Sequence, residues 1–412
     1  FFHQGAFRQT MGVLYAGYIE GNGVTLPEGD AYEVYLRYPT LRALARAAGV
    51  DSLPSWVGFR EHPAYDSYWK SRALQNTLTR SNVPTLWVAA AWDEEDLLGA
   101  QLMYRTLERT ITRHSHFFVL GPWSHTTSSR GRGDSLGAIP LGEATAEYYR
   151  AMIERPWFSQ YLHGRGDWPP PEAQVYLTGG GGWRHFDRWP PRGTRPKRLY
   201  FHGGGTLSFT PPTGSAACQP FTSDPAHPVP NAPPGDDGST NWLLADQRFL
   251  AGRADVLSWR SEPLTEDLVI AGDVAAHLVA STTGTDADWV VKLIDVYPDT
   301  LAEHPELAGH QLMVSADIFR GRYRQGFDRP LPLEAGRPLP YTIDLHQQFY
   351  RFRRGHRLMV QVQSSWFPMY DRNPQRFVPN IFLADSADYV TQRHCVSQSS
   401  GAASYLTFGV LP

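Results

Sequence analysis

An aspartate and a histidine have the clearest potential for chemistry in this sequence, and each follows an apolar run. Asp93 comes just after the run at 83–91, and His125 comes shortly after the run at 116–120, in the turn GPWSH. Such runs are typical of strands buried in a parallel sheet, and the carboxyl ends of neighbouring parallel strands meet at one edge of that sheet. We therefore expect the two side chains to lie close together, where a carboxylate can orient an imidazole that takes a proton from a serine hydroxyl.

The chain order of these two residues indicates one kind of catalytic triad. Asp followed by His, each after a late strand, is the order of the α/β-hydrolase triad, in which the serine comes first. A structural interpretation stays open at this point, because Asp93 and Asp96 have the spacing of a helix N-terminal cap. Acids there stabilise a helix by about 0.3–1 kcal/mol each, and a single histidine in a Gly-Pro turn is often structural as well.

The sequence offers no convincing nucleophile for this pair. GDSLG at 133–137 fits the GxSxG pattern, but Ser135 follows a Gly/Arg/Ser-rich loop and comes after His125, whereas a nucleophile elbow needs a strand before it and a helix after it. HGGG at 202–205 resembles an oxyanion loop, yet it lies between two short β-type runs and is expected to be a hairpin loop. Serines before Asp93 lack a glycine two residues to either side. We therefore expect the serine to come from outside this chain.

The elements that must position these residues fall into three segments. Residues 1–80 have helix-compatible stretches, and residues 81–166 read as strand, helix, strand, helix, with the first helix marked by Leu98, Leu102, Leu107 and Ile111. Residues 167–412 have short alternating runs such as LVIAGDVAAHLVAS separated by turns, which predicts an antiparallel sandwich or jelly roll. Two parallel strands are too few for a stable sheet. We expect other strands to complete it, this sequence being the C-terminal portion of a longer protein or one of two chains.

Composition excludes several classes of function. The 412 residues are 42% hydrophobic, enough for more than one core, and the net charge of −3 without a basic run argues against nucleic acid as a partner. No apolar stretch approaches the roughly 20 residues needed to cross a membrane. The two cysteines, Cys218 and Cys395, form no CxxC motif and no Cys/His cluster, so we expect neither a zinc site nor a disulfide framework, and whether the two pair stays open. We expect no metal site and no cofactor.

Several motifs together resemble one known family. FFHQGAFRQ at 1–9, REHPAYDSYW at 60–69, AAWDEEDLLGA at 90–100, GPWSH and RLYFHGGGTLSF are similar to α-amino-acid ester hydrolases, which belong with cocaine esterase, glutaryl-cephalosporin acylase and X-prolyl dipeptidyl aminopeptidases. The resemblance covers essentially the whole chain. It implies an incomplete α/β-hydrolase core with a helical cap at 1–80, the C-terminal part of the core at 81–166, and a jelly-roll domain at 167–412. The nucleophilic serine and the oxyanion-hole tyrosine would lie upstream of Phe1.

The resemblance also implies roles for individual residues. Asp93 matches the triad acid and His125 the triad base. Glu95 and Asp96 match two of the three carboxylates that hold the α-ammonium group of the substrate, and the third would fall just upstream of Phe1. Charge-assisted hydrogen bonds of this kind contribute about 1.5–3 kcal/mol each. Glu94 has no role in the resemblance and is expected to face solvent.

The resulting prediction is a serine hydrolase that cleaves, and can transfer, α-amino acyl groups of esters and β-lactam amides through an acyl-enzyme. Its partners would be those small molecules and the segment or second chain that carries the serine. A homo-oligomer in the periplasm or outside the cell is expected from the family. The alternatives are a cocaine-esterase-like hydrolase, a dipeptidyl peptidase or acylase of the same fold, and a non-catalytic jelly-roll binding module.

Overall fold

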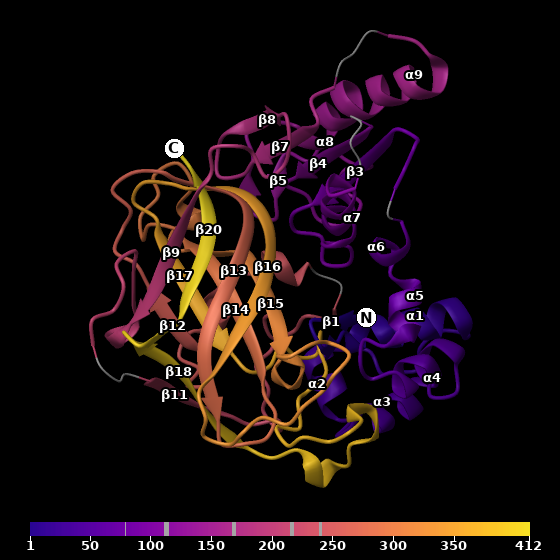
Figure 1. Cartoon of the computed structure of the whole chain (residues 1–412), viewed down its shortest axis with the longest axis vertical. Helices are drawn as coiled ribbons and strands as arrows, with labels where there is room; N and C mark the ends of the chain where they lie inside the picture. The colour runs from indigo at the N-terminus through magenta and orange to yellow at the C-terminus, as the bar shows by residue number, and fades with distance from the viewer. Residues whose placement is uncertain (79, 111–114, 167–169, 215–217, 239–240) are drawn as a thin grey trace.

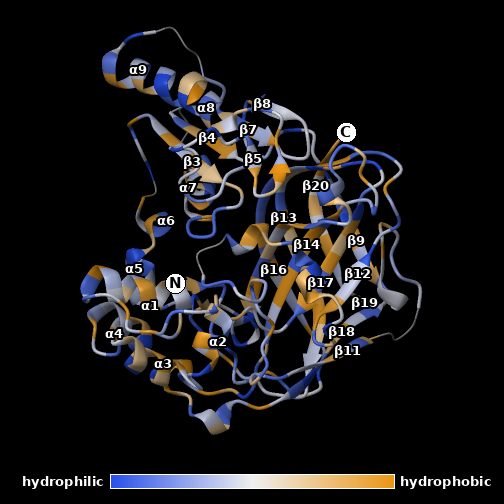
Figure 2. Cartoon of the chain, turned by 180° about the vertical axis from the view of Figure 1, so that it is seen from behind, coloured by the Kyte–Doolittle hydropathy of each residue, from blue (hydrophilic) through white to orange (hydrophobic). Residues whose placement is uncertain are grey.

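A computed structural model describes residues 1–78, 80–110, 115–166, 170–214, 218–238 and 241–412. Figure 1 shows a large β domain, a small sheet with its helices at one end of that domain, and a helical layer beside its other end. Apolar residues follow the strands of both sheets (Figure 2). Within the described residues, every helix is too short or too polar to pass through a lipid bilayer.

The N-terminal segment begins with a hairpin that the sequence did not predict, and the predicted helical layer follows it. The hairpin joins β1 (Phe2–His3) to β2 (Ala6–Phe7). The helices are α1 (Gln9–Tyr15), continued by a π-helical turn at Ala16–Glu20, then α2 (Ala31–Leu36), α3 (Leu41–Ala48), α4 (Pro54–Glu61), α5 (Ser67–Arg72) and α6 (Leu74–Thr77). Local sequence explains α3 well, because Thr40 caps its N-terminus and Gly49 ends it in the left-handed region at φ 75°.

The small sheet has the strand order β3-β4-β7-β8. Its strands are β3 (Thr85–Ala90), β4 (His116–Gly121), β7 (Ala173–Leu177) and β8 (Gly182–Phe186); the first three are parallel and β8 pairs antiparallel with β7. Helix α7 (Gly99–Glu108) connects β3 to β4, whereas α8 (Thr145–Tyr148), a π-helical turn at Tyr149–Glu154 and α9 (Arg155–His163) lie between β4 and β7. Of the residues expected to mark α7, Ile111 lies outside the described residues.

The expectation of only two parallel strands is wrong. A third comes from residues beyond 166, because the run AQVYL, which resembles the β-rich part in composition, pairs with β4 instead. This sheet therefore runs past the boundary expected between 166 and 167. Strand composition predicts a strand but does not say which sheet it joins, since pairing is decided by contacts distant in sequence.

The two central strands differ in burial. Every residue of β4 is buried, as predicted for a strand covered on both faces. Most of β3 is only half-buried, so the same prediction is wrong for β3 in this chain. The reason is that β3 lies at the edge of the sheet, with β4 as its neighbour there, and Val83 before it is 62% exposed.

Residues beyond the small sheet form an almost entirely antiparallel sheet of 12 strands, as the alternating runs predicted. The long strands are β13 (Leu268–Thr282), β14 (Asp288–Val296), β15 (Gln311–Arg320), β16 (Leu339–Phe352) and β17 (Arg357–Gln363). The others are β9 (Arg195–His202), β10 (Thr206–Ser208), β11 (Cys218–Ser223), β12 (Leu257–Arg260), β18 (Gln392–Ser399), β19 (Ala402–Ala403) and β20 (Tyr405–Leu411).

One hydrophobic core joins the small sheet to the β domain. Trp92 and Phe118 from the small sheet belong to the same buried cluster as Trp259 and Trp289 of the β domain. A second cluster holds the helical layer together and includes Phe382 from a loop of the β domain. The two cysteines form a disulfide between β11 and β18, which answers the question that the sequence left open.

Candidate active site

The fold brings Asp93 and His125 together at the carboxyl ends of β3 and β4. The register pairs Ala90 with Gly121, and the pairing continues as Ala91 N–H donates to the Gly121 carbonyl at 2.9 Å. His125 Nδ1 lies 3.1 Å from Asp93 Oδ1 and 3.3 Å from Oδ2. Asp93 is buried and the imidazole is partly exposed. This is the geometry of a carboxylate that orients a general base.

Asp93 caps a turn rather than a helix, because α7 begins only after Leu98, which has no side-chain cap. The Oδ1 atom of Asp93 accepts hydrogen bonds from the backbone N–H groups of Glu95 and Asp96, both at 2.9 Å. The structural and the catalytic interpretation of this residue therefore describe one arrangement. The cap fixes the carboxylate in the orientation in which it meets the imidazole.

The backbone around His125 is tightly constrained. A Cβ on Gly121 would lie 2.4 Å from the Trp123 ring, so this packing requires glycine at the end of β4. The Trp123 ring is held by a hydrogen bond from its Nε1 to Thr145 Oγ1 at 2.9 Å. Thr126 adopts φ 62°, which is rare for a β-branched residue and costs of order 1–3 kcal/mol. Such strain persists where the surroundings fix the backbone, and it clusters at functional sites.

The acidic residues after Asp93 surround the imidazole. Glu95 Oε2 lies 3.7 Å from His125 Nε2, and Asp96 Oδ2 lies 3.9 Å from Nδ1. Their side chains are 43% and 79% exposed. Partial burial lowers the pKa of His125, but the charge and hydrogen bond of Asp93, with the charges of Glu95 and Asp96, outweigh it, so the pKa is raised above its usual value.

Glu94 is half-buried, whereas the sequence led us to expect it to face solvent. Its side chain turns back toward the GPWSH turn, where Oε2 accepts a hydrogen bond from the backbone N–H of His125 at 3.4 Å. Burial raises the pKa of this carboxyl. The cause is the tight turn made by the Asp93 cap, which directs Glu94 inward and leaves the next two acids at the surface.

The β domain holds the loop that carries Asp93. Trp92 Nε1 donates to the Met313 carbonyl at 2.8 Å, Asn241 Nδ2 donates to the Trp92 carbonyl at 2.8 Å, and Gln348 Nε2 donates to the Ala91 carbonyl at 3.4 Å. The partners lie 149 to 257 positions apart in sequence. Sequence reasoning missed them, and the one available signal was a tryptophan placed directly before the acidic run.

Neither sequence motif for a nucleophile has a catalytic context in the fold. Ser135 lies in a small hairpin formed by β5 (Ser135–Leu136) and β6 (Ile139–Pro140), without the strand-to-helix turn of a nucleophile elbow. The glycines after His202 connect the antiparallel strands β9 and β10, as the hairpin interpretation predicted.

Among the described residues, two other groups of side chains have the chemistry of metal ligands. One consists of His3, Asp317 and His346, and the other of Glu108, His116 and Glu172. In the first, the Asp317 carboxylate already accepts hydrogen bonds from His3 Nε2 at 2.7 Å, from Gln4 Nε2 at 2.6 Å and contacts His346 Nε2 at 2.7 Å. Hydrogen bonds thus account for this arrangement without an ion, and the expectation of no metal site stays a prediction.

Comparisons with known proteins place the chain in a family. Residues 1–127 match the X-Pro dipeptidyl-peptidase (S15) family, and residues 167–407 match the X-Pro dipeptidyl-peptidase C-terminal non-catalytic domain. The chain belongs to the X-Pro dipeptidyl-peptidase family that these two models describe. The resemblance indicated by the sequence motifs is confirmed.

Members and relatives of the family include hydrolases of several kinds. The chain is 32% identical to cocaine esterase of Rhodococcus sp. (strain MB1 Bresler) over 334 residues, which cover 76% of this chain and 54% of the esterase. The structure of an α-amino acid ester hydrolase superposes with a TM-score of 0.95 at 41% identity, covering 99% of this chain and 69% of the other. An aminopeptidase from the marine sediment archaeon Thaumarchaeota archaeon superposes with a TM-score of 0.96 at 39% identity, covering 100% and 69%.

Proposed function

We propose that this chain supplies the acid and the base of a serine hydrolase that acts on α-amino acyl esters. The observation that carries the proposal is the contact of His125 Nδ1 with Asp93 at 3.1 Å, beside two exposed acids. In this arrangement Asp93 fixes the tautomer of His125, and Nε2 removes the proton from a serine hydroxyl as it attacks the ester carbonyl. The imidazolium then protonates the leaving alcohol, and water releases the acyl group by the same steps in reverse order.

The serine is proposed to come from a segment upstream of Phe1 or from a second chain. The half-buried edge strand β3 supports this part of the proposal, because another strand pairing there would cover its exposed backbone and side chains. On this proposal the small sheet is the C-terminal part of an α/β-hydrolase core, residues 1–80 are its cap, and the large β domain is a jelly roll.

Glu95 and Asp96 are proposed to bind the substrate's α-ammonium group. Two exposed carboxylates beside the base can accept charge-assisted hydrogen bonds from an ammonium group close to the scissile carbonyl. The α-amino acid ester hydrolase and the aminopeptidase, at 41% and 39% identity, are both named for substrates that carry such a group. Transfer of the acyl group to a β-lactam amine is the same chemistry with an amine in place of water.

Bound substrate would also adjust the base. The charges of Glu95 and Asp96 raise the pKa of His125, and a substrate ammonium placed between these acids offsets their charge. The pKa of His125 then falls in the complex, so that binding the correct substrate generates the neutral imidazole that acylation needs.

The principal alternative is a cocaine-esterase-like hydrolase without amine selectivity, which the 32% identity to that esterase favours. A second alternative is a non-catalytic binding module. The Cys218–Cys395 disulfide supports the proposal of a periplasmic or secreted protein, since disulfides persist in oxidising compartments. Assembly into a homo-oligomer is proposed from the family alone.

The test uses the full-length protein, meaning this chain together with the segment or second chain that carries the serine. Its substrates are phenylalanine methyl ester and methyl 3-phenylpropanoate, which lacks the amino group. We expect kcat/KM to be higher for the amino ester by about tenfold or more, the value of one charge-assisted hydrogen bond. Labelling of the active serine by a fluorophosphonate probe should require His125 and disappear in His125→Ala. Equal rates on the two esters would refute the amine selectivity, and labelling that survives His125→Ala would refute the triad.

A further inference from the structure

The acid loop, defined as residues 93–96, is held from a second side by an arginine of the N-terminal hairpin. Arg8 Nη1 donates to the Glu95 carbonyl at 2.8 Å, and Nη2 donates to the Glu94 carbonyl at 2.5 Å. The two residues are 87 and 86 positions from Arg8. A planar guanidinium with fixed donors suits two consecutive carbonyls.

These bonds complement the cap made by Asp93. Asp93 Oδ1 accepts from the N–H of Glu95, while Arg8 donates to the carbonyl of the same residue. Glu95 is thus held on both sides of its Cα, and the direction of its side chain is fixed by the backbone. This matters because the Glu95 and Asp96 side chains are exposed and have little packing of their own to orient them.

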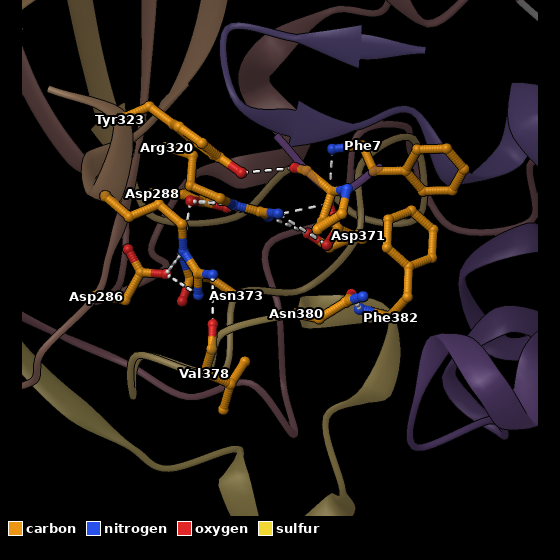
Figure 3. Close-up of polar contacts among 12 residues, drawn as sticks. Phe7, Asp286, Asp288, Arg320, Tyr323, Asp371, Asn373, Val378, Asn380 and Phe382 are labelled. Atoms are coloured by element: carbon orange, nitrogen blue, oxygen red, sulfur yellow. Dashed lines mark hydrogen bonds and ion pairs between the residues drawn. The ribbon is translucent and has the colours of Figure 1, made fainter. Parts of the chain in front are cut away.

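Arg8 is itself held rigidly by the β domain. Phe7 N–H donates to Asp371 Oδ1 at 2.8 Å and its carbonyl accepts from Asp371 N–H at 3.0 Å, as Figure 3 shows for the first of these bonds. Asp371 is paired in turn with the buried Arg320, which also binds Asp288 (Figure 3). The backbone N–H of Arg320 donates to the Gln4 carbonyl at 3.0 Å. The hairpin is therefore fixed to strand β15 directly before Arg8.

We propose that Arg8 is a positioning residue that sets the selectivity of the enzyme for α-amino acyl substrates. Its two donors reach the carbonyls of Glu94 and Glu95, whereas the backbone just before Asp93 is held by Asn241 at the Trp92 carbonyl, so loss of Arg8 should displace Glu95 and Asp96 more than the acid and base. It holds Glu95 and Asp96 where a substrate ammonium meets both. This inference deepens the proposed function and rests on it.

The experiment compares Arg8→Gln and Arg8→Lys with the wild-type full-length protein, using the same two esters. Arg8→Gln should raise KM for phenylalanine methyl ester about ten- to hundredfold, the effect of a misplaced binding group, with kcat changed less than about twofold. For methyl 3-phenylpropanoate, kcat/KM should stay within about twofold of wild type. Arg8→Lys keeps the charge and three donors but lacks the planar fork that reaches two consecutive carbonyls, so it should show a smaller rise in KM.

The matched control is Arg42→Gln on α3. Arg42 is an exposed arginine of the helical layer that pairs with Asp385, and its replacement should leave the rates on both esters unchanged. An amino-ester preference retained by Arg8→Gln, or an equal loss on both esters in Arg8→Gln and Arg8→Lys, would overturn the role of Arg8. A wild-type protein without amino-ester preference would instead overturn the proposed function, so the two failures are distinct.

Discussion

At the scale of single residues, charge placement decides what His125 can do. Asp93 orients the ring through Nδ1, and three carboxylates within 4 Å of the imidazole raise its pKa. Glu94 differs from them because it is turned inward and accepts from the backbone of His125. Four consecutive acids therefore have three different roles: orienting the base, fixing its backbone, and facing the proposed substrate.

A pH profile tests this view of the charges. Because the pKa of free His125 is raised, kcat/KM should fall on the acidic side at a pH above 6.5, the usual histidine value, as the base becomes protonated. Glu95→Gln and Asp96→Asn each remove a negative charge, so each should move this acidic limb to lower pH. For the amino ester, the limb in kcat should lie at lower pH than the limb in kcat/KM, since bound ammonium offsets the acids.

Glu334→Gln is the control for this pH profile, because Glu334 is an exposed acid of the β domain paired with Arg337. It should leave the limb in place. Acidic limbs that coincide in wild type, Glu95→Gln and Asp96→Asn would show that these acids do not act on His125.

At the scale of elements, the sequence predicts a helix or strand where the signal lies within the segment itself. It does not predict which distant segment that helix or strand contacts. Helix α3 follows from its caps at Thr40 and Gly49, and strand β4 follows from its apolar run, since both signals are contained in the segment itself. The sequence pattern places β7 in the wrong sheet because its partner strand, β4, lies 55 residues earlier in the chain, as the pairing of Phe118 with Ala173 shows. The contacts of Arg8 and Asn241 with the loop around Asp93 could not be foreseen for the same reason.

Gly121 allows the junction between β4 and the GPWSH turn to be tested. Gly121→Ala places a methyl group 2.4 Å from the Trp123 ring and should destabilise the protein by about 1–3 kcal/mol, the usual cost of overpacking. It should also lower kcat, because His125 is displaced. Gly99→Ala is the control: apart from its chain neighbours and the backbone of its own helix, no atom lies within 4 Å of the new methyl group at the start of α7, so no clash is expected. Thermal unfolding and ester hydrolysis check both, and equal behaviour of the two variants would contradict the packing argument.

At the scale of the whole molecule, the β domain acts as the frame of the site. The core shared by Trp92 and Trp289, and the bonds from Met313 and Asn241 to the loop around Asp93, tie the acid to strands of the β domain. The same domain fixes the N-terminal hairpin through Asp371. Both sides of the proposed ammonium site are therefore anchored to the β domain, most of which matches the domain described as non-catalytic.

The disulfide separates the stability of this frame from the chemistry of the site. Cys218 and Cys395 join β11 to β18 at the end of the β domain remote from β3 and β4 (Figure 1), and they close a loop of 177 positions. Replacing both with serine should lower the free energy of unfolding by about 2–4 kcal/mol, because the unfolded chain gains conformational freedom.

Reduction of the wild-type protein should lower the free energy of unfolding, measured by calorimetry, by the same amount, and the double variant should not respond to the reductant. At a temperature where both proteins are folded, kcat/KM for the amino ester should be unchanged, since Arg8 holds the acid loop and Asn241 holds Trp92 directly before it. A matching fall in activity would mean that the far end of the β domain also positions the site.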